Sequence, residues 1–169
     1  MRRKDREVQN RAEVLDILNR CDTVRIAMYG ERHPYVVPVS FGMEEADGKV
    51  VLYFHCAKQG LKVDLLKANK HVCIEGDIFI QTEKTAHGIT VRYESVIGFG
   101  ECVLLTNTDE IKHGLKTLLD HYGYDDYPLD RCMGLNYVLI GKIVLDNITG
   151  KRNLPGTLTS ADQIDGKQN

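Results

Sequence analysis

Two lysines and a histidine–cysteine pair lie in one short segment, and their side chains are the best suited to chemistry. Residues 50–70 read VVLYFHCAKQGLKVDLLKANK, in which His55 and Cys56 are followed by Lys58 and Lys62. Lysine ammonium groups bind phosphate through charge-assisted hydrogen bonds. The segment therefore indicates an anion site, provided that the backbone also points donors at the same place.

The local pattern predicts such a backbone. Residues 50–55 are apolar, β-branched or aromatic, as in a buried strand. Residues 60–69 carry apolar side chains at helical spacing, at Leu61, Leu65 and Ala68. A tight strand-to-helix turn directs unpaired N–H groups at one spot, which attracts anions. A cation in the first helical turn, such as Lys62, is unfavourable unless an anion is bound there. We predict a phosphate site at this turn; the alternative is that Lys58 and Lys62 are solvated surface lysines.

Length and composition limit the class of protein. The chain has 169 residues, of which 43% are hydrophobic and 27% charged, and its net charge is −2. These values predict one globular domain over residues 1–152, followed by a polar tail over 153–169. The charge argues against general nucleic-acid binding. Neither G-x-G-x-x-G nor a P-loop motif occurs, so a nucleotide-like ligand would use another kind of site.

Other sequence features bear on location and metals. No apolar run suits a signal peptide or a membrane span, so we expect no membrane association. The five cysteines are widely spaced and odd in number, which predicts free thiols and a cytoplasmic protein. The histidines other than His55 show no metal-ligand spacing, so no metal site is expected.

Hydrophobic periodicity predicts a mainly β protein. Strands are expected over residues 23–29, 35–41, 49–55, 71–80, 89–105 and 136–145, and helices over 13–20, 60–69 and from a cap at Thr108. Pro38 places its strand at an edge, and Asp47-Gly48 predicts a hairpin. Gly98 and Gly100 predict a bend in the longest strand, and 81–88 a polar loop. Consecutive hairpins favour an antiparallel Greek-key barrel with helices outside it.

Five segments resemble a known family in order and spacing. They are MRRKDREV, YVVPVSFG, FHCAKQGLKVDLL, YESVIGFGE and ITGK. They resemble the nitroimidazole-resistance (Nim) proteins of the pyridoxamine 5′-phosphate oxidase-like, FMN-binding split-barrel superfamily, and the resemblance covers residues 1–152. It implies an antiparallel split barrel of six to seven strands with flanking helices. It also implies a homodimer that binds FMN in two clefts between the subunits.

The resemblance assigns cofactor contacts to several positions. Lys62 matches the phosphate-binding lysine, while Leu61 replaces an arginine of the superfamily, a loss that Lys58 would offset. His55 and Cys56 would border the phosphate and ribityl chain. The remaining positions are Val39 and Ser40 at the isoalloxazine edge, Ser95 and Val96 near the ring or phosphate, and Lys151 or Arg152 reaching across the dimer. Without the resemblance, Arg92 and Glu94 predict an exposed ion pair, and Cys56 a small buried apolar residue.

The implied function is reduction of small aromatic or nitro compounds by a flavoprotein, as in reduction of a 5-nitroimidazole to its amine. His55 would contact cofactor or substrate, and Tyr137 or Phe99 would wall the acceptor pocket. One alternative is a haem-binding or haem-degrading protein with His55 as axial ligand. Another is a flavin-binding protein without turnover. Oxidation of pyridoxamine phosphate itself is disfavoured, since no arginine-rich substrate end is evident.

Overall fold

The structure is a computed structural model that describes residues 2–86, 88–129 and 138–155. The chain divides into two compact units. The first contains the described parts of residues 1–21, 76–97 and 149–169, and the second contains those of 22–75 and 98–148. Three long strands run through both units: β6 (His71–Thr85), β7 (Gly88–Leu104) and β8 (Val138–Asn153).

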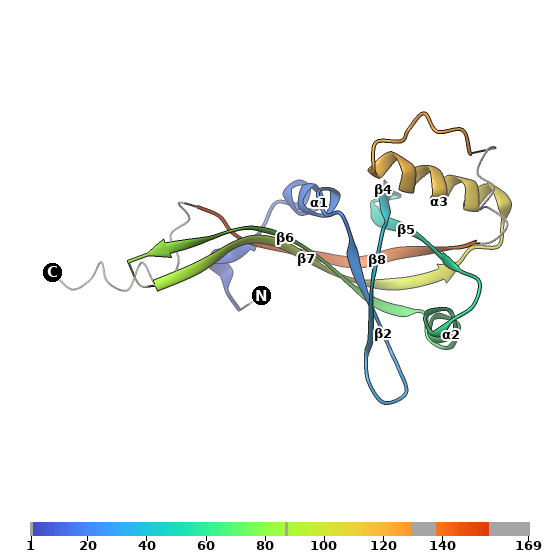
Figure 1. Cartoon of the computed structure of the whole chain (residues 1–169), viewed down its shortest axis with the longest axis horizontal. Coiled ribbons are helices and arrows are strands. Elements are labelled where there is room, and N and C mark those ends of the chain that lie inside the picture. The colour runs from blue at the N-terminus through green and yellow to red at the C-terminus, as the bar shows by residue number, and fades with distance from the viewer. Residues whose placement is uncertain (1, 87, 130–137, 156–169) are drawn as a thin grey trace. The chain divides into compact units, whose positions relative to one another are not determined.

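The strands form one sheet in the order β3-β2-β6-β7-β8-β5-β4, and β1 pairs with β8 (Figure 1). The short strands are β1 (Glu7–Val8), β2 (Val24–Met28), β3 (Tyr35–Val39), β4 (Gly42–Ala46) and β5 (Lys49–Ala57). The sheet has eight strands and is mostly antiparallel. The helices are η1 (Lys4–Arg6), α1 (Arg11–Asn19), α2 (Leu61–Ala68) and α3 (Thr108–His121). The predicted split-barrel fold class is confirmed.

Local turn chemistry explains the hairpins of the second unit. Asp47 and Gly48 both have positive φ, 51° and 75°, and join β4 to β5 as predicted. Strand β3 lies at one end of the strand order, the position that Pro38 requires because it lacks an N–H donor. The expected strand over 35–41 is shorter than predicted, since β3 ends at Val39 and β4 begins at Gly42.

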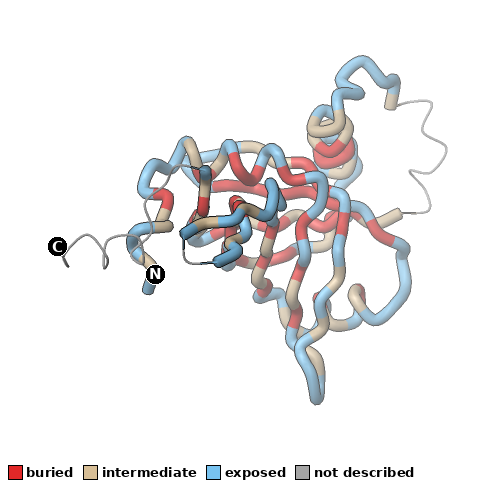
Figure 2. Tube along the Cα trace, turned by 60° about the vertical axis from the view of Figure 1, so that its left-hand side comes forward, coloured by how far each residue is buried: buried red, intermediate tan, exposed pale blue. Residues whose placement is uncertain are grey.

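Burial alternates along β2 and much of β7, and Figure 2 shows red segments separated by tan or pale blue ones. In β2, Val24, Ile26 and Met28 are buried and Arg25 is exposed, as the period of two predicts. In the described part of the chain, no helix is both long and apolar enough to cross a membrane.

Three local predictions are wrong. Helix α3 is capped by Asn107 instead of Thr108, because the Asn107 Oδ1 accepts the N–H groups of Asp109 and Glu110 at 2.9 and 3.1 Å. Helix α2 buries Val63 and Leu66, whereas Leu61 is 55% exposed, because another face of the helix packs inward. Residues 81–85 continue β6, since exposed polar side chains are compatible with a strand that pairs along its backbone.

The predicted exposure of Arg92 and Glu94 is also wrong. In the first unit both residues are buried, and each has a partner of opposite charge. The Arg92 Nε donates to Glu83 at 2.8 Å, and the Arg20 guanidinium donates to Glu94 at 2.6 Å. Arg92 Nη1 also donates to the Asn153 side chain at 3.0 Å and to the Leu154 carbonyl at 2.9 Å. These contacts tie the end of β8 to β6 and β7, a pairing that the spacing within β7 cannot show.

Candidate functional site

The predicted strand–turn–helix is present at the end of β5. The strand ends at Ala57, three polar or glycine residues follow, and α2 begins after Gly60. Gly60 has φ 128°, a conformation that favours glycine, and its carbonyl accepts the N–H groups of Val63 and Asp64 at 2.9 and 3.2 Å. No side chain caps this helix end. The N–H groups at the very start of α2 are therefore available to an anion.

Lys62 lies in that first turn and is positioned by an aromatic ring. Its Nζ is 5.4 Å from the centre of the Phe54 ring, within the range of a cation–π contact. Phe54 is fully buried in β5, so the ring is a fixed support for the lysine stem. Lys58 is exposed in the preceding loop. The turn therefore combines two ammonium groups with an uncapped helix start, as the sequence predicted.

His55 and Cys56 lie at the same strand end but face opposite sides. His55 is exposed and pairs in register with Ile140 of β8. Cys56 is buried; burial raises the pKa of its thiol, and the charge of Lys62 only partly opposes this. Burial, together with Cys56, raises the pKa of the Cys102 thiol to about 12. Cys56 therefore packs as a small buried residue, whereas His55 is exposed and can contact a ligand.

Val39 and Ser40 lie at the end of the edge strand β3. Val39 is buried and pairs with Val24 of β2, while Ser40 is exposed just beyond the strand. The side chain of Val39 is thus part of the core, and only its backbone could meet a ring. The contact of Val39 and Ser40 with the isoalloxazine edge stays a prediction.

The other predicted contacts belong to the first unit. Val96 is completely buried, and Ser95 is partly exposed beside it. Lys151 lies over the Tyr93 ring, with its Nζ 5.7 Å from the ring centre. Arg152 forms an ion pair with Glu13 at 2.7 Å. Of the two basic candidates for a contact across a dimer, Lys151 is therefore the one without an acidic partner among the ion pairs of the described residues.

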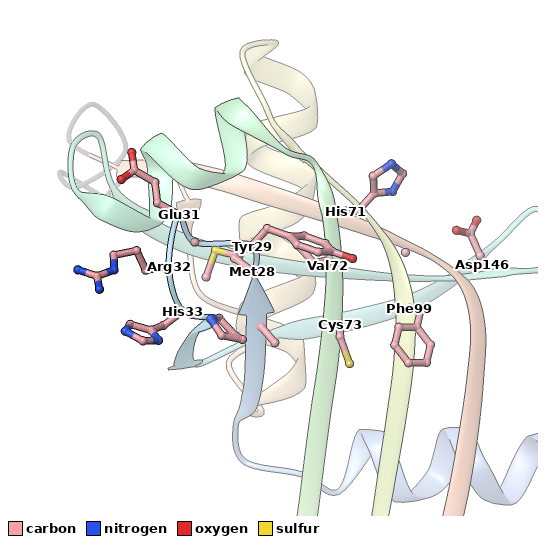
Figure 3. Close-up of a pocket in the computed structure, with 14 residues that line it drawn as sticks. Met28, Tyr29, Glu31, Arg32, His33, His71, Val72, Cys73, Phe99 and Asp146 are labelled. Carbon is pink, nitrogen blue, oxygen red and sulfur yellow. The ribbon is translucent and has the colours of Figure 1, made fainter.

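A cavity of about 530 Å³ lies wholly within the second unit (Figure 3). It is lined by the β2–β3 hairpin, the start of β6, the second half of β7 and one residue of β8, at residues 27–34, 71–73, 99–100 and 146. The Tyr29 ring extends from the hairpin toward β6, whereas Arg32 points away from that strand (Figure 3). Phe99 is part of this wall, its role at an acceptor pocket stays a prediction, and Tyr137 lies outside the described residues.

Sequence reasoning missed two features of these sites. None of the predicted cofactor contacts lines the cavity, and its hairpin residues, Tyr29 among them, were assigned only to a strand end and a turn. The apolar pattern of residues 50–55 predicts only burial for Phe54. An aromatic residue just before the turn is also a signal that a nearby lysine, here Lys62, forms a cation–π contact with it.

Comparison with known proteins places this geometry in a family. No protein with a curated description matches the chain. Among solved structures, a protein from Bacteroides thetaiotaomicron, whose name gives it a proposed role in 5-nitroimidazole antibiotic resistance, is 25% identical. The match covers 86% of each chain with a TM-score of 0.76.

Two further structures are similar in fold. A FAD-binding protein from Mesorhizobium loti is 20% identical over 88% of this chain and 97% of its own, with a TM-score of 0.64. A FAD- and haem-binding protein from Mycobacterium smegmatis is 16% identical over 96% of this chain and 80% of its own, with a TM-score of 0.73. The model of the pyridoxamine 5′-phosphate oxidase family matches residues 10–152. The chain therefore belongs to the pyridoxamine 5′-phosphate oxidase family.

Proposed function

We propose that the protein is an FMN-binding flavoprotein that reduces small aromatic or nitro compounds. The observation that carries this proposal is the turn before α2, where Lys62, held over Phe54, adjoins an uncapped helix start. The similarity to the Bacteroides thetaiotaomicron protein, at 25% identity, supports a nitro-aromatic acceptor.

The residues present fit the phosphate of FMN. A phosphate dianion needs donors and positive charge, and the turn offers backbone N–H groups, Lys62 and the exposed Lys58. Leu61, where the superfamily carries an arginine, is exposed and leaves room beside the turn. When bound, the flavin supplies the electron transfer, and the protein supplies its position and surroundings. His55, exposed at the adjoining strand end, is the side chain that we assign to contact with cofactor or acceptor.

A homodimer is part of this proposal. In the first unit, Phe79 of β6 and Ile89, Val91 and Ile97 of β7 are exposed, and those of β7 lie at odd-numbered positions, on one face of that strand. Apolar side chains gathered in this way are typical of a contact surface between proteins. We propose that a second copy covers this face, with the cofactor between the subunits and Lys151 reaching toward it. Cys56 and Cys102 are buried free thiols, which suits a reducing compartment such as the cytoplasm.

The first experiment is the visible spectrum of the freshly purified protein, followed by mass spectrometry of the ligand released by heat. Flavin bands with FMN released are expected. A Soret band would favour the haem alternative, and His55→Ala should then abolish it while leaving any flavin binding largely intact. A protein that takes up neither added FMN nor haem would refute the proposed function.

A matched pair of variants tests the turn itself. Lys62→Ala should weaken FMN binding by roughly tenfold or more, since one hydrogen bond to a charged group contributes about 1.5–3 kcal/mol. Lys67→Ala, on an exposed position in the last turn of the same helix, is the control and should bind FMN like the wild type. Equal affinity in all three proteins would show that the phosphate lies elsewhere.

A further inference from the structure

Several apolar side chains line the cavity of the second unit, in contrast to the polar turn before α2. Of the residues that line the cavity, Tyr29 is 68% and Phe99 51% exposed, and Met28 and Cys73 are also part of the lining. Among the residues that the structure describes, neither aromatic ring stacks on another ring. Two exposed aromatic side chains at one hollow are typical of a ligand site.

The size of the cavity suits a small molecule. A volume of about 530 Å³ falls within the range of small-molecule pockets. The hairpin wall has a defined shape, because a Cβ at Gly30 would lie 2.2 Å from the His33 carbonyl oxygen. The loop therefore depends on glycine at this position, and it holds Tyr29 at one side of the hollow.

The charges around the cavity disfavour an anion. The lining residues include one arginine, Arg32, and two carboxylates, Glu31 and Asp146. Arg32 and Glu31 lie at the outer edge of the hairpin, and Arg32 points away from β6 and β7 (Figure 3). No residue of the turn at 58–62 lines the cavity. A phosphate would find neither excess positive charge nor a helix start here, in contrast to the turn before α2.

We propose that this cavity binds an uncharged planar aromatic molecule, with the rings of Tyr29 and Phe99 forming its apolar walls. Aromatic rings pair favourably in offset or edge-to-face geometry, and thioether and thiol sulfur atoms also contact ring edges. His33 and His71 at the rim can each donate or accept a hydrogen bond to a ring substituent. The inference goes beyond the proposed function, because this binding requires no flavin.

The test uses the full chain freed of flavin and two small probes of matched size. The uncharged probe is 4-fluoronitrobenzene and the anionic probe is 4-fluorobenzoate, each followed by its fluorine NMR signal. Binding of the uncharged probe is expected, with much weaker binding of the anion. Phe99→Ala and Tyr29→Ala should each lower the affinity for the uncharged probe by roughly threefold to tenfold, the range expected for the loss of one aromatic contact.

Two further variants make the test decisive. Val103→Ala removes another exposed apolar side chain from the same face of β7 outside the cavity, and should leave binding unchanged. Cys73→Trp should fill the hollow and abolish binding. The proposal is overturned if the wild type fails to bind the uncharged probe, if the anion binds as tightly, or if Val103→Ala weakens binding as much as Phe99→Ala.

A change in oligomeric mass for the Phe99→Ala protein would assign this surface to a protein partner instead, and would also overturn the proposal. Tyr29 and Phe99 are both exposed, so truncation should leave the fold intact, which circular dichroism checks. Because the probes are added to flavin-free protein, failure here is distinct from failure to bind FMN.

Discussion

The Nζ of Lys62 lies 5.4 Å from the centre of the Phe54 ring, so a buried aromatic side chain of β5 positions the cation at the start of α2. A flexible lysine loses rotamer freedom when it binds an anion. The ring reduces that loss by holding the ammonium group near the turn before the anion arrives. Phe54 is therefore a positioning residue for the proposed phosphate site.

Phe54→Leu tests this relationship. The substitution keeps an apolar side chain but removes the cation–π contact, so FMN affinity should fall by roughly twofold to fivefold, the equivalent of about 0.5–1 kcal/mol. Affinity is measured by the change in flavin fluorescence on titration. Phe41→Leu is the control, because Phe41 is equally buried but contacts His121 instead, at 4.4 Å between ring centres. If both variants lose affinity equally, the effect is general loosening of the core.

The buried ion pairs of the first unit give a prediction for stability. Arg92→Met should lower the free energy of unfolding by about 2 kcal/mol, because Glu83, Asn153 and the Leu154 carbonyl lose a charged donor. Urea denaturation measures the change. Arg25→Met, which removes an exposed pair with Glu75, should cost less than about 1 kcal/mol. If Arg92→Met lowered the free energy of unfolding by less than Arg25→Met, the buried contacts of Arg92 would not stabilise the fold as predicted.

Two glycines of β7, Gly98 and Gly100, should differ in how strongly a substitution by alanine lowers stability. A Cβ at Gly100 would lie 2.1 Å from the Val144 carbonyl oxygen, whereas one at Gly98 would first meet the Leu145 Cδ1 at 2.9 Å. Backbone cannot move aside as a side-chain methyl can, so Gly100→Ala should destabilise by about 2–3 kcal/mol and Gly98→Ala by about 1 kcal/mol. Thermal unfolding of the two variants should show this order. A larger loss of stability for Gly98→Ala than for Gly100→Ala would mean that the backbone of β8 shifts more easily than the Leu145 side chain.

The sequence predicted what depends on neighbours along the chain. The strand, turn and helix around Lys62 follow from hydrophobic spacing within residues 50–70, and the Asp47-Gly48 hairpin follows from two residues. The burial of Arg92 depends on Asn153 and Leu154, which are distant in sequence. The alternation of apolar and polar residues along a strand predicts that its two faces differ, but it does not predict which residues cover each face.

The sequence did not predict the cavity, because its lining residues are also distant from one another along the chain. It forms where a hairpin loop meets the start of β6 and the second half of β7, so its residues share no motif and no spacing. Tyr29 directly follows β2 and Phe99 lies between two glycines, and both positions have simpler local explanations. Only the pairing of β2 with β6 and of β6 with β7 brings them to the same hollow.

A three-residue contact between α3 and the β4–β5 hairpin should make stability depend on pH. Glu44 accepts hydrogen bonds from the Tyr53 hydroxyl and from the His113 ring, both at 2.9 Å. Partial burial tends to raise the pKa of the Glu44 carboxyl, but these two hydrogen bonds outweigh it and hold the pKa below its usual value of 4.5. The same contact and the burial of Tyr53 raise the pKa of its hydroxyl.

The sign of the pH effect follows from this lowered value. A carboxylate whose pKa is lower in the folded than in the unfolded state adds stability above the unfolded pKa, and that contribution is lost as pH falls through the folded pKa. The wild type should therefore be more stable than Glu44→Gln near neutral pH, and this advantage should shrink between about pH 5.5 and pH 3. Urea midpoints at several pH values measure it. Glu31→Gln, at an exposed position of the loop between β2 and β3, should instead follow the wild type throughout. An advantage over Glu44→Gln that stays constant down to pH 3 would mean that the carboxylate gains nothing from His113 and Tyr53 on folding.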